Sequence, residues 1–487
     1  MTRPARRPFA IDGWLVALTV AMSFIAQPPA AIDGGTSVGG MAVSAPASPD
    51  PLAATGGPVQ VRGAVDRTRV LQGSDGTVRV ELNITGERRP MARLPRTPTD
   101  VVIVLDRSGS MDGEKIRWAR SAAQELIGML SADDRFSLVT YSNRADVAIP
   151  FAAASSALRT QWQRTVGHVE AGGSTNIGAA LDAADAILDE HRTPGRAARV
   201  VLISDGLPTA GDTSTEGLVR RARRALKDEY VLSAVGVGED FNEHLMTSIA
   251  DAGTGNFYYL ERGTALASVF TDEFESSREQ IAGGLKVTMR PGAGVRVVDA
   301  AGYPLYTEGS AVWFSPGALF AGQQRTVWVT LQAPTGSTGE RSLVDIEVTY
   351  ADGTGKRNAV AMADLPRVTC VEDPDAYARG IDKKKWEESQ VKDTWSAVRA
   401  KVARQVQLGN RDEALRELNS YKEDTAALNA VVGSAAVDAN LMDVEELEAS
   451  VEDAFDGDER EQKKKRNVYS KSERLDSLDA RRSGAKR

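Results

Sequence analysis

Residues 101–110 have the sequence VVIVLDRSGS, in which five apolar residues are followed directly by an acidic residue and, at alternate positions, two serines. A continuous apolar run of this kind is typical of a strand that is buried on both faces of a parallel sheet. Apolar residues then recur at helical spacing between Ile116 and Leu130. The segment therefore predicts a buried strand, a tight polar loop and a helix.

The same pattern continues along the chain on either side of this segment. Further apolar runs at residues 136–140, 200–203 and 231–237 predict buried strands, and helical patterns lie between them. Strands that alternate with helices form a doubly wound α/β fold. We therefore predict a Rossmann-like α/β domain over residues 98–280.

Two β segments flank this domain. Apolar residues alternate with polar ones before it, at Val78, Val80, Leu82 and Ile84, and the alternation returns after residue 284. A period of two is typical of half-buried strands. We predict a β-sandwich in which the α/β domain is inserted or which flanks it, with crossings near residues 96 and 283.

Helical patterns replace the strands after Pro374, and the chain ends in densely alternating charge. The former predicts a small helical hairpin or bundle, and the latter is typical of a disordered tail. The expected organisation is a signal peptide or N-terminal anchor (1–31), a flexible Ala/Pro/Gly linker (32–57), N-terminal sandwich strands (58–97), the α/β domain (98–280), C-terminal sandwich strands (281–372), the helical domain (373–456) and the charged tail (457–487).

The N-terminus predicts export. Arg3, Arg6 and Arg7 precede an apolar stretch over residues 14–26, which has the layout of a secretory signal and is short for a membrane span. Pro29 fits poorly in a cleavage site, so an uncleaved membrane anchor is the alternative. We expect a periplasmic, cell-surface or secreted protein.

Composition excludes several classes of function. The chain of 487 residues has 59 Lys and Arg against 67 Asp and Glu, so its net charge of −8 argues against a nucleic-acid partner. Its single cysteine cannot form an intramolecular disulfide, and its three histidines lack the spacing of a zinc motif.

Three polar loops point to one cation site. Asp106, Ser108 and Ser110 alone would fit either a helix cap or a metal loop. Thr175 lies in a second loop, Gly-Gly-Ser-Thr-Asn, and Asp205 follows another buried strand. Ligands of open α/β sheets bind at the carboxyl ends of strands, so these loops can converge. Their oxygen donors suit Mg²⁺ or Mn²⁺.

With these motifs in order, residues 98–280 resemble a von Willebrand factor A domain with a metal-ion-dependent adhesion site. The resemblance implies that Ser108, Ser110 and Thr175 coordinate the metal directly, while Asp106 and Asp205 act mostly through water. Ser174 beside Thr175 is the alternative, but the family places Thr before Asn. More distantly, the layout resembles exported bacterial proteins of this type and inter-alpha-trypsin inhibitor heavy chains.

The resemblance also implies what the metal does. In the family, a carboxylate of a partner protein completes the coordination, so we expect a non-enzymatic protein-binding module for adhesion or scaffolding. The alternatives are a metal-dependent hydrolase, for which no general base is evident, and structural self-association through the same metal site, in which an acidic residue of another copy or of the chain's own tail ligates the metal. We expect rim contacts from Arg107, Met111, Asn143 and Arg144. A ligand-driven shift is expected in a last helix over residues 264–280.

Overall fold

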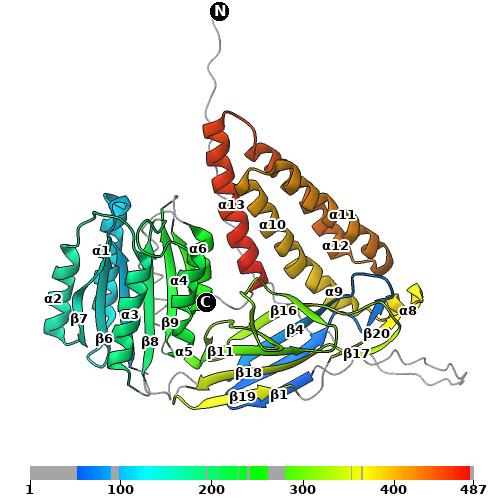
Figure 1. The fold of residues 1–487 in the computed structure, drawn as a ribbon, viewed down its shortest axis with the longest axis horizontal. Coiled ribbons are helices and arrows are strands. Elements are labelled where there is room, and N and C mark those ends of the chain that lie inside the picture. The colour runs from blue at the N-terminus through cyan, green and yellow to red at the C-terminus, as the bar shows by residue number, and fades with distance from the viewer. Residues whose placement is uncertain are drawn as a thin grey trace, which may run out of the picture. The chain divides into compact units, whose positions relative to one another are not determined.

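The parallel sheet of the α/β domain is arranged as its apolar runs predict (Figure 1). Its central strand β5 lies between β8 and β6, and the edge strand β7 is antiparallel to β6. In spatial order the strands are β10 (Thr254–Leu260), β9 (Val231–Val237), β8 (Ala197–Ser204), β5 (Thr99–Asp106), β6 (Arg135–Tyr141) and β7 (Ala145–Ala153). The strand order reverses around β5, so the loop after β5 lies where ligands bind in such sheets.

The alternating side chains of β5 explain why both faces of the sheet are covered. Val101, Ile103 and Leu105 pack with α1 and α2, whereas Val102 and Val104 pack with α3, α4 and α6. The helices are α1 (Glu114–Met129), α2 (Ser156–Gly167), α3 (Ile177–His191), α4 (Thr215–Ala222), α5 (Arg224–Lys227) and α6 (Glu243–Ala252). Burial of every residue of β5 confirms the predicted doubly wound fold.

The computed structural model describes residues 52–88, 98–193, 196–205, 207–228, 230–238, 242–260, 280–352, 354–362 and 366–482. All of them fall in one compact unit, Pro49–Arg487. The expected leader, most of the linker and the expected last helix of the α/β domain lie outside these residues. None of the helices within the described ranges is long and apolar enough to span a membrane.

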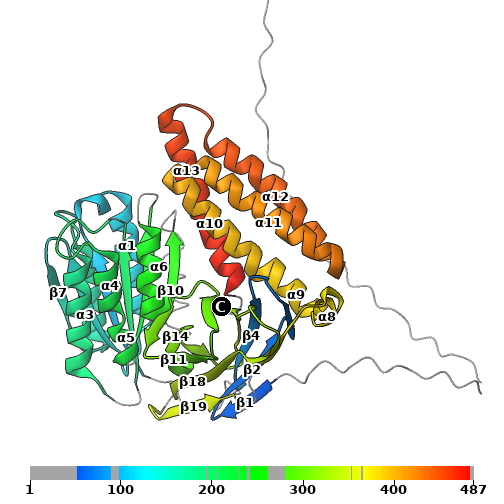
Figure 2. The same ribbon diagram turned by 45° about the vertical axis from the view of Figure 1, so that its right-hand side comes forward.

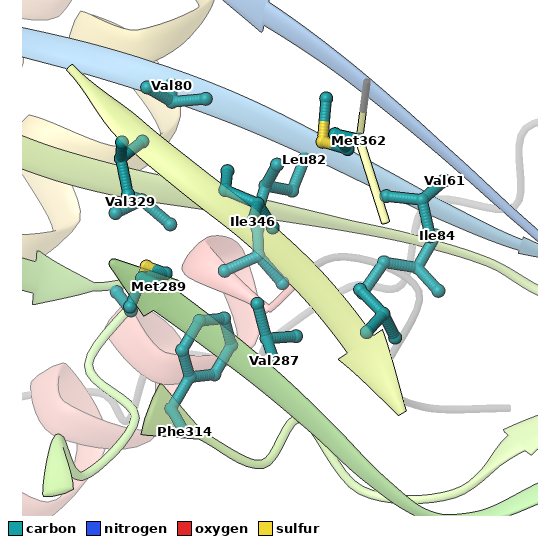
Figure 3. Packing of buried hydrophobic residues seen from close by; sticks show 14 of the residues in the cluster. Val61, Val80, Leu82, Ile84, Val287, Met289, Phe314, Val329, Ile346 and Met362 are labelled. Carbon is teal, nitrogen blue, oxygen red and sulfur yellow. The ribbon is translucent and has the colours of Figure 1, made fainter. Parts of the chain in front are cut away.

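The flanking strands form two larger sheets that share one hydrophobic core. Figure 3 shows Val61, Leu82 and Val329 of one sheet facing Val287 and Ile346 of the other. The first sheet runs β1 (Leu52–Gly56), β2 (Val59–Val65), β4 (Thr77–Gly86), β16 (Gln324–Gln332) and β12 (Arg296–Ala300). The second runs β13 (Tyr306–Glu308), β14 (Ala311–Phe314), β11 (Gln280–Pro291), β18 (Val344–Asp352) and β19 (Arg357–Ala361), and β15 (Leu319–Phe320) pairs with β11.

The insertion predicted from the sequence is confirmed by strand pairing. β4, which precedes the α/β domain, pairs along its length with β16, which follows that domain. A small third sheet adds β17 (Gly339–Ser342), β20 (Arg367–Val371) and β3 (Arg69–Leu71). One boundary differs from the prediction, because β1 occupies residues expected to be linker. Its backbone pairs with β2, which a composition rich in small residues does not prevent.

The helical region contains long antiparallel helices, as Figure 2 shows. Gly409 and Gly433 adopt left-handed conformations that end α10 and α11. The elements are α8 (Pro374–Arg379), α9 (Lys383–Glu388), the π-helical turn η4 (Ser389–Thr394), α10 (Trp395–Leu408), α11 (Arg411–Val432), α12 (Ala435–Ala454) and α13 (Glu459–Arg481).

Helix α13 corrects the expected disorder of residues 457–487 over Glu459–Arg481, whereas residues 483–487 lie outside the described residues. Asp458 and Glu461 form a capping box at its start. Several of its charges have partners on other elements; Glu473, for example, accepts from Arg399 of α10 at 2.7 Å. Its far end reaches the α/β domain, where Arg482 forms two hydrogen bonds, of 2.6 and 3.0 Å, with Asp251 of α6. Charge alternation here reflects pairing between helices, which composition alone does not reveal.

Candidate metal centre

Asp106 ends β5, and both of its carboxylate oxygens are held. The backbone N–H of Ser108 donates to Oδ1 at 2.8 Å, and the hydroxyl of Ser204, the last residue of β8, donates to Oδ2 at 2.7 Å. Asp106 has no exposed surface. The carboxylate is thereby fixed in one orientation, as a ligand or a ligand-supporting group must be.

The two serines continue from Asp106 towards the next strand. Ser108 Oγ and Ser110 Oγ lie 3.1 Å apart, and Ser110 Oγ donates to Asp205 Oδ1 at 2.7 Å. Ser108 and Asp205 are buried, whereas Ser110 is exposed, so the cluster opens to solvent on the Ser110 side. Four of the five predicted ligand residues therefore form one hydrogen-bonded cluster.

The loop that carries Thr175 joins the cluster through its backbone. Gly109 N–H donates to Gly173 O at 3.0 Å, and Gly172 N–H donates to Arg107 O at 2.6 Å. Gly173 has a φ of +92°, and an added Cβ would lie 2.8 Å from Asn143 Oδ1. Glycine is thus required both by conformation and by close approach.

Within that loop, Ser174 and Thr175 face different partners. The Ser174 hydroxyl donates to Asn143 Oδ1 at 2.6 Å. Thr175 is buried, and its N–H donates to Thr209 Oγ1 at 2.9 Å. Since the Ser174 hydroxyl is engaged by Asn143, Thr175 remains our candidate for the fifth ligand.

Sequence reasoning missed Lys115, the second residue of α1. Its Nζ lies 2.5 Å from Asp205 Oδ2 and 3.3 Å from Ser110 O. Gly238 makes room for it, since a Cβ there would lie 2.8 Å from Lys115 Cε. The ammonium therefore occupies the acidic side of the cluster as a built-in cation. In the sequence, the only sign of this role is that Lys115 lies five residues after Ser110.

Electrostatics make the cluster receptive to a cation. Burial raises the pKa of Asp106, and the nearby charge of Asp205 adds to this, while hydrogen bonds from Ser108 and Ser204 oppose it. Two buried carboxylates face one ammonium group, so the cluster keeps an excess of negative charge when both are ionised. A divalent cation would relieve this excess.

The donor chemistry fits a hard cation. All five candidate groups are carboxylate or hydroxyl oxygens, which suit Mg²⁺ or Mn²⁺ better than zinc or copper. Across the described ranges, no cluster of three or more His, Cys, Asp or Glu side chains could hold a metal by itself. Any metal at this centre therefore depends on the hydroxyls of Ser108, Ser110 and Thr175.

The expected rim needs one correction. Met111 has no exposed surface and packs in the core between β5 and α1, because it is the last residue of a 3-10 turn that points inward. Asn143 and Arg144 are exposed, and Arg107 is partly exposed. Arg107 and Arg144 both pair with Asp146, at 3.5 and 3.1 Å.

Comparison with known proteins agrees with the fold of the α/β domain. The family model described as von Willebrand factor type A domain matches residues 100–272. Inter-alpha-trypsin inhibitor heavy chain H4 of Homo sapiens is 31% identical over 183 residues, which are 36% of this chain and 20% of that protein. The chain thus spans a fifth of that relative's length.

Two solved structures share the fold over most of the chain. A von Willebrand factor type A protein from Catenulispora acidiphila superposes with a TM-score of 0.62 at 18% identity, covering 86% of this chain and 96% of that one. The ArnB paralog VWA2 from Sulfolobus acidocaldarius gives 0.54 at 16% identity, covering 88% and 99%. Residues 100–272 form a von Willebrand factor type A domain, and the likeness in fold extends to the flanking regions.

Proposed function

We propose that this protein is an exported, non-enzymatic binding module that docks an acidic side chain of a partner protein onto a Mg²⁺ or Mn²⁺ ion. The observation that carries the proposal is the hydrogen-bonded cluster of Asp106, Ser108, Ser110 and Asp205 at the switch point of the sheet. Its domain belongs to a family of protein-interaction modules.

Each group has a distinct role in this proposal. Ser108, Ser110 and Thr175 supply neutral oxygens, while Asp106 and Asp205 supply negative charge. Bound metal would supply a positive centre for an incoming carboxylate, which gains a charge-assisted bond. Because the direct protein ligands are largely neutral hydroxyls, the ion would keep enough charge to favour an acidic partner over a neutral one.

Export is part of the proposal on sequence grounds. Three arginines precede the apolar stretch of residues 14–26, which is the layout of a secretory signal. Fractionation of cells that produce the full chain tests this point: we expect the protein outside the cytosol, either released or held at the membrane by an uncleaved leader. A cytosolic protein would refute it.

Metal titration tests the centre itself. We would titrate the full chain with MgCl₂ and MnCl₂ by calorimetry, beside Asp106→Asn and the matched control Asp112→Asn. Asp112 is exposed on the same loop and lies outside the cluster. We expect saturable binding in the wild type and control and at least about a tenfold loss in Asp106→Asn. Equal affinity in all three proteins would contradict the proposal.

Docking is tested with a peptide library whose members carry one Asp or Glu, each matched by its Asn or Gln counterpart. We expect Mn²⁺-dependent binding of acidic members only, lost with chelator and in Asp106→Asn. A metal-dependent change in sedimentation of the protein alone would instead favour self-association. Metal-dependent turnover of phosphate or ester substrates, lost in Asp106→Asn, would favour a hydrolase.

A further inference from the structure

A cavity lies at the junction between the α/β domain and the sandwich. One wall is formed by α4, Arg223 and α5, and the other by β11, β14, β18 and β19. Figure 1 shows α5 beside β11. The cavity has a volume of about 690 Å³, which lies within the range of small-molecule sites. We refer to it as the basic cleft.

The charge of the basic cleft is of one sign. Six of its lining residues are Lys or Arg, and no described lining residue is Asp or Glu. The six cations are Arg220, Arg223, Arg224, Lys227, Lys286 and Arg357. The chain as a whole has a net charge of −8. The positive charge of the cleft is therefore a local feature that the overall composition does not explain.

The helical wall brings its cations together by spacing. Residues 220, 223, 224 and 227 recur at intervals of three and four, which places their side chains on one face of the α4–α5 segment. Like charges at these intervals repel one another. A face that keeps four of them is suited to an anion that offsets this repulsion.

The surrounding carboxylates neutralise only part of this charge. Arg224 pairs with Asp182 at 2.8 Å and with Asp185 at 3.2 Å, and Lys286 pairs with Glu308 at 3.0 Å. Arg220 lies 3.7 Å from Glu216, with both side chains largely exposed. Lys227 has no ion pair with any residue that the structure describes. None of these carboxylates belongs to a residue that lines the cleft, so the charged side chains among the described lining residues are all cationic.

Arg223 adds a specific donor. Its guanidinium stacks 3.9 Å from the ring centroid of Tyr306, and its buried Nε has no hydrogen-bond partner within the described ranges. Stacking holds the guanidinium plane fixed, and a fixed planar fork matches the oxygens of a phosphate group. An unsatisfied buried donor beside a cavity indicates a missing acceptor.

We propose that the basic cleft binds a small molecule that carries several phosphate groups. Four arginines provide planar forks for bidentate contacts, and two lysines provide point charges on both walls. The Thr349 and Asn358 side chains add neutral polar groups on the strand wall. Cations lie on both walls, so the arrangement favours an oligophosphate that bridges α4–α5 and the sandwich.

The test uses the full chain in buffer free of divalent cations at near-physiological salt, so that metal chelation does not contribute. Inorganic tripolyphosphate probes a linear chain of phosphates, and inositol hexakisphosphate probes phosphates spaced around a ring. We expect saturable one-to-one binding of at least one probe by calorimetry. The better probe distinguishes the two arrangements.

Lys227→Glu combined with Arg357→Glu reverses one cation on each wall. We expect this variant to lose at least about tenfold in affinity. The matched control, Lys384→Glu combined with Arg460→Glu, makes the same change in net charge at exposed sites in the helical region and should bind like the wild type. Thermal unfolding checks that both variants fold, and Lys227→Gln with Arg357→Gln replaces the reversal if it does not.

Binding of neither probe, or equal affinity in the cleft variant and the control, would overturn the proposal. Asp106→Asn should bind the phosphate probes like the wild type, because the metal centre lies at the carboxyl ends of the strands and the cleft does not include it. Failure of one proposal is thus distinguishable from failure of the other.

Discussion

The metal centre and the basic cleft concentrate opposite charges in different ways. In the metal centre, the Asp106 and Asp205 carboxylates are buried, and hydrogen bonds and the Lys115 ammonium compensate them. In the cleft, cations line an open cavity and are only partly paired. The contrast teaches that a buried charge must have its partners built in, whereas a solvated cluster can leave them to a ligand.

The largest effect is expected at Glu243, a buried carboxylate whose Oε1 lies 3.6 Å from Arg474 Nε and has no hydrogen-bond partner within the described ranges. Burial raises its pKa from 4.5 to about 7, although Arg474 opposes this. The folded state therefore binds more protons than the unfolded state between these pH values, and stability falls as pH rises through that window. We expect Glu243→Gln to stabilise the protein by about 2–3 kcal/mol more at pH 8 than at pH 5.

Urea unfolding of the wild type and the variant at both pH values measures this difference. Glu216→Gln removes a carboxylate whose side chain is 92% exposed, and it should show no comparable pH dependence. A pH-independent effect of Glu243→Gln would mean that ionisation of the buried Glu243 carboxylate does not lower the free energy of unfolding between pH 5 and pH 8.

The next effect concerns the support of Asp106. Ser204→Ala removes the hydroxyl that donates to Asp106 Oδ2, so the carboxylate should lose its fixed orientation. Loss of such supporting contacts typically costs about 10–100-fold in metal affinity. Calorimetry with Mn²⁺ measures the change, and Ser174→Ala, whose hydroxyl bonds Asn143 instead, serves as the control. Unchanged affinity in Ser204→Ala would show that backbone contacts alone hold Asp106.

Lys115→Met tests whether the Lys115 ammonium opposes metal binding. Removing a positive charge next to Asp205 should tighten Mn²⁺ binding by about three- to tenfold, because metal and ammonium repel each other. Without metal, the variant should be less stable than the wild type by about 1–2 kcal/mol, since Asp205 loses its partner. Weaker metal binding in the variant would instead make Lys115 a support for the ligands.

The smallest effect is expected at the rim. Asp146→Asn removes the partner of Arg107 and Arg144, and the Arg144 side chain is 82% exposed. Exposed ion pairs contribute about 0–1 kcal/mol, so we expect almost no change in thermal stability or in metal affinity. A large loss of metal affinity would extend the metal centre beyond the residues assigned to it.

The features that could be predicted from the sequence are those that depend on residues close together along the chain. The loop after β5 and the strand alternation at Val78 to Ile84 both follow from local patterns, and the structure bears out the α/β domain, the sandwich and the helical region. Lys115 and Ser204 were missed because their roles depend on contacts across the fold. The basic cleft joins residues of α4 and β19, so no window of sequence contains it.

The contact of Arg482 with Asp251 sets an order of events during synthesis. The two residues are 231 positions apart, so a ribosome working at about 5–20 residues per second needs roughly 12–46 s to complete this pair. Asp251 is therefore without this cationic partner until the end of α13 has been synthesised. Glu243 of α6 likewise gains its partner, Arg474, only when this last helix docks.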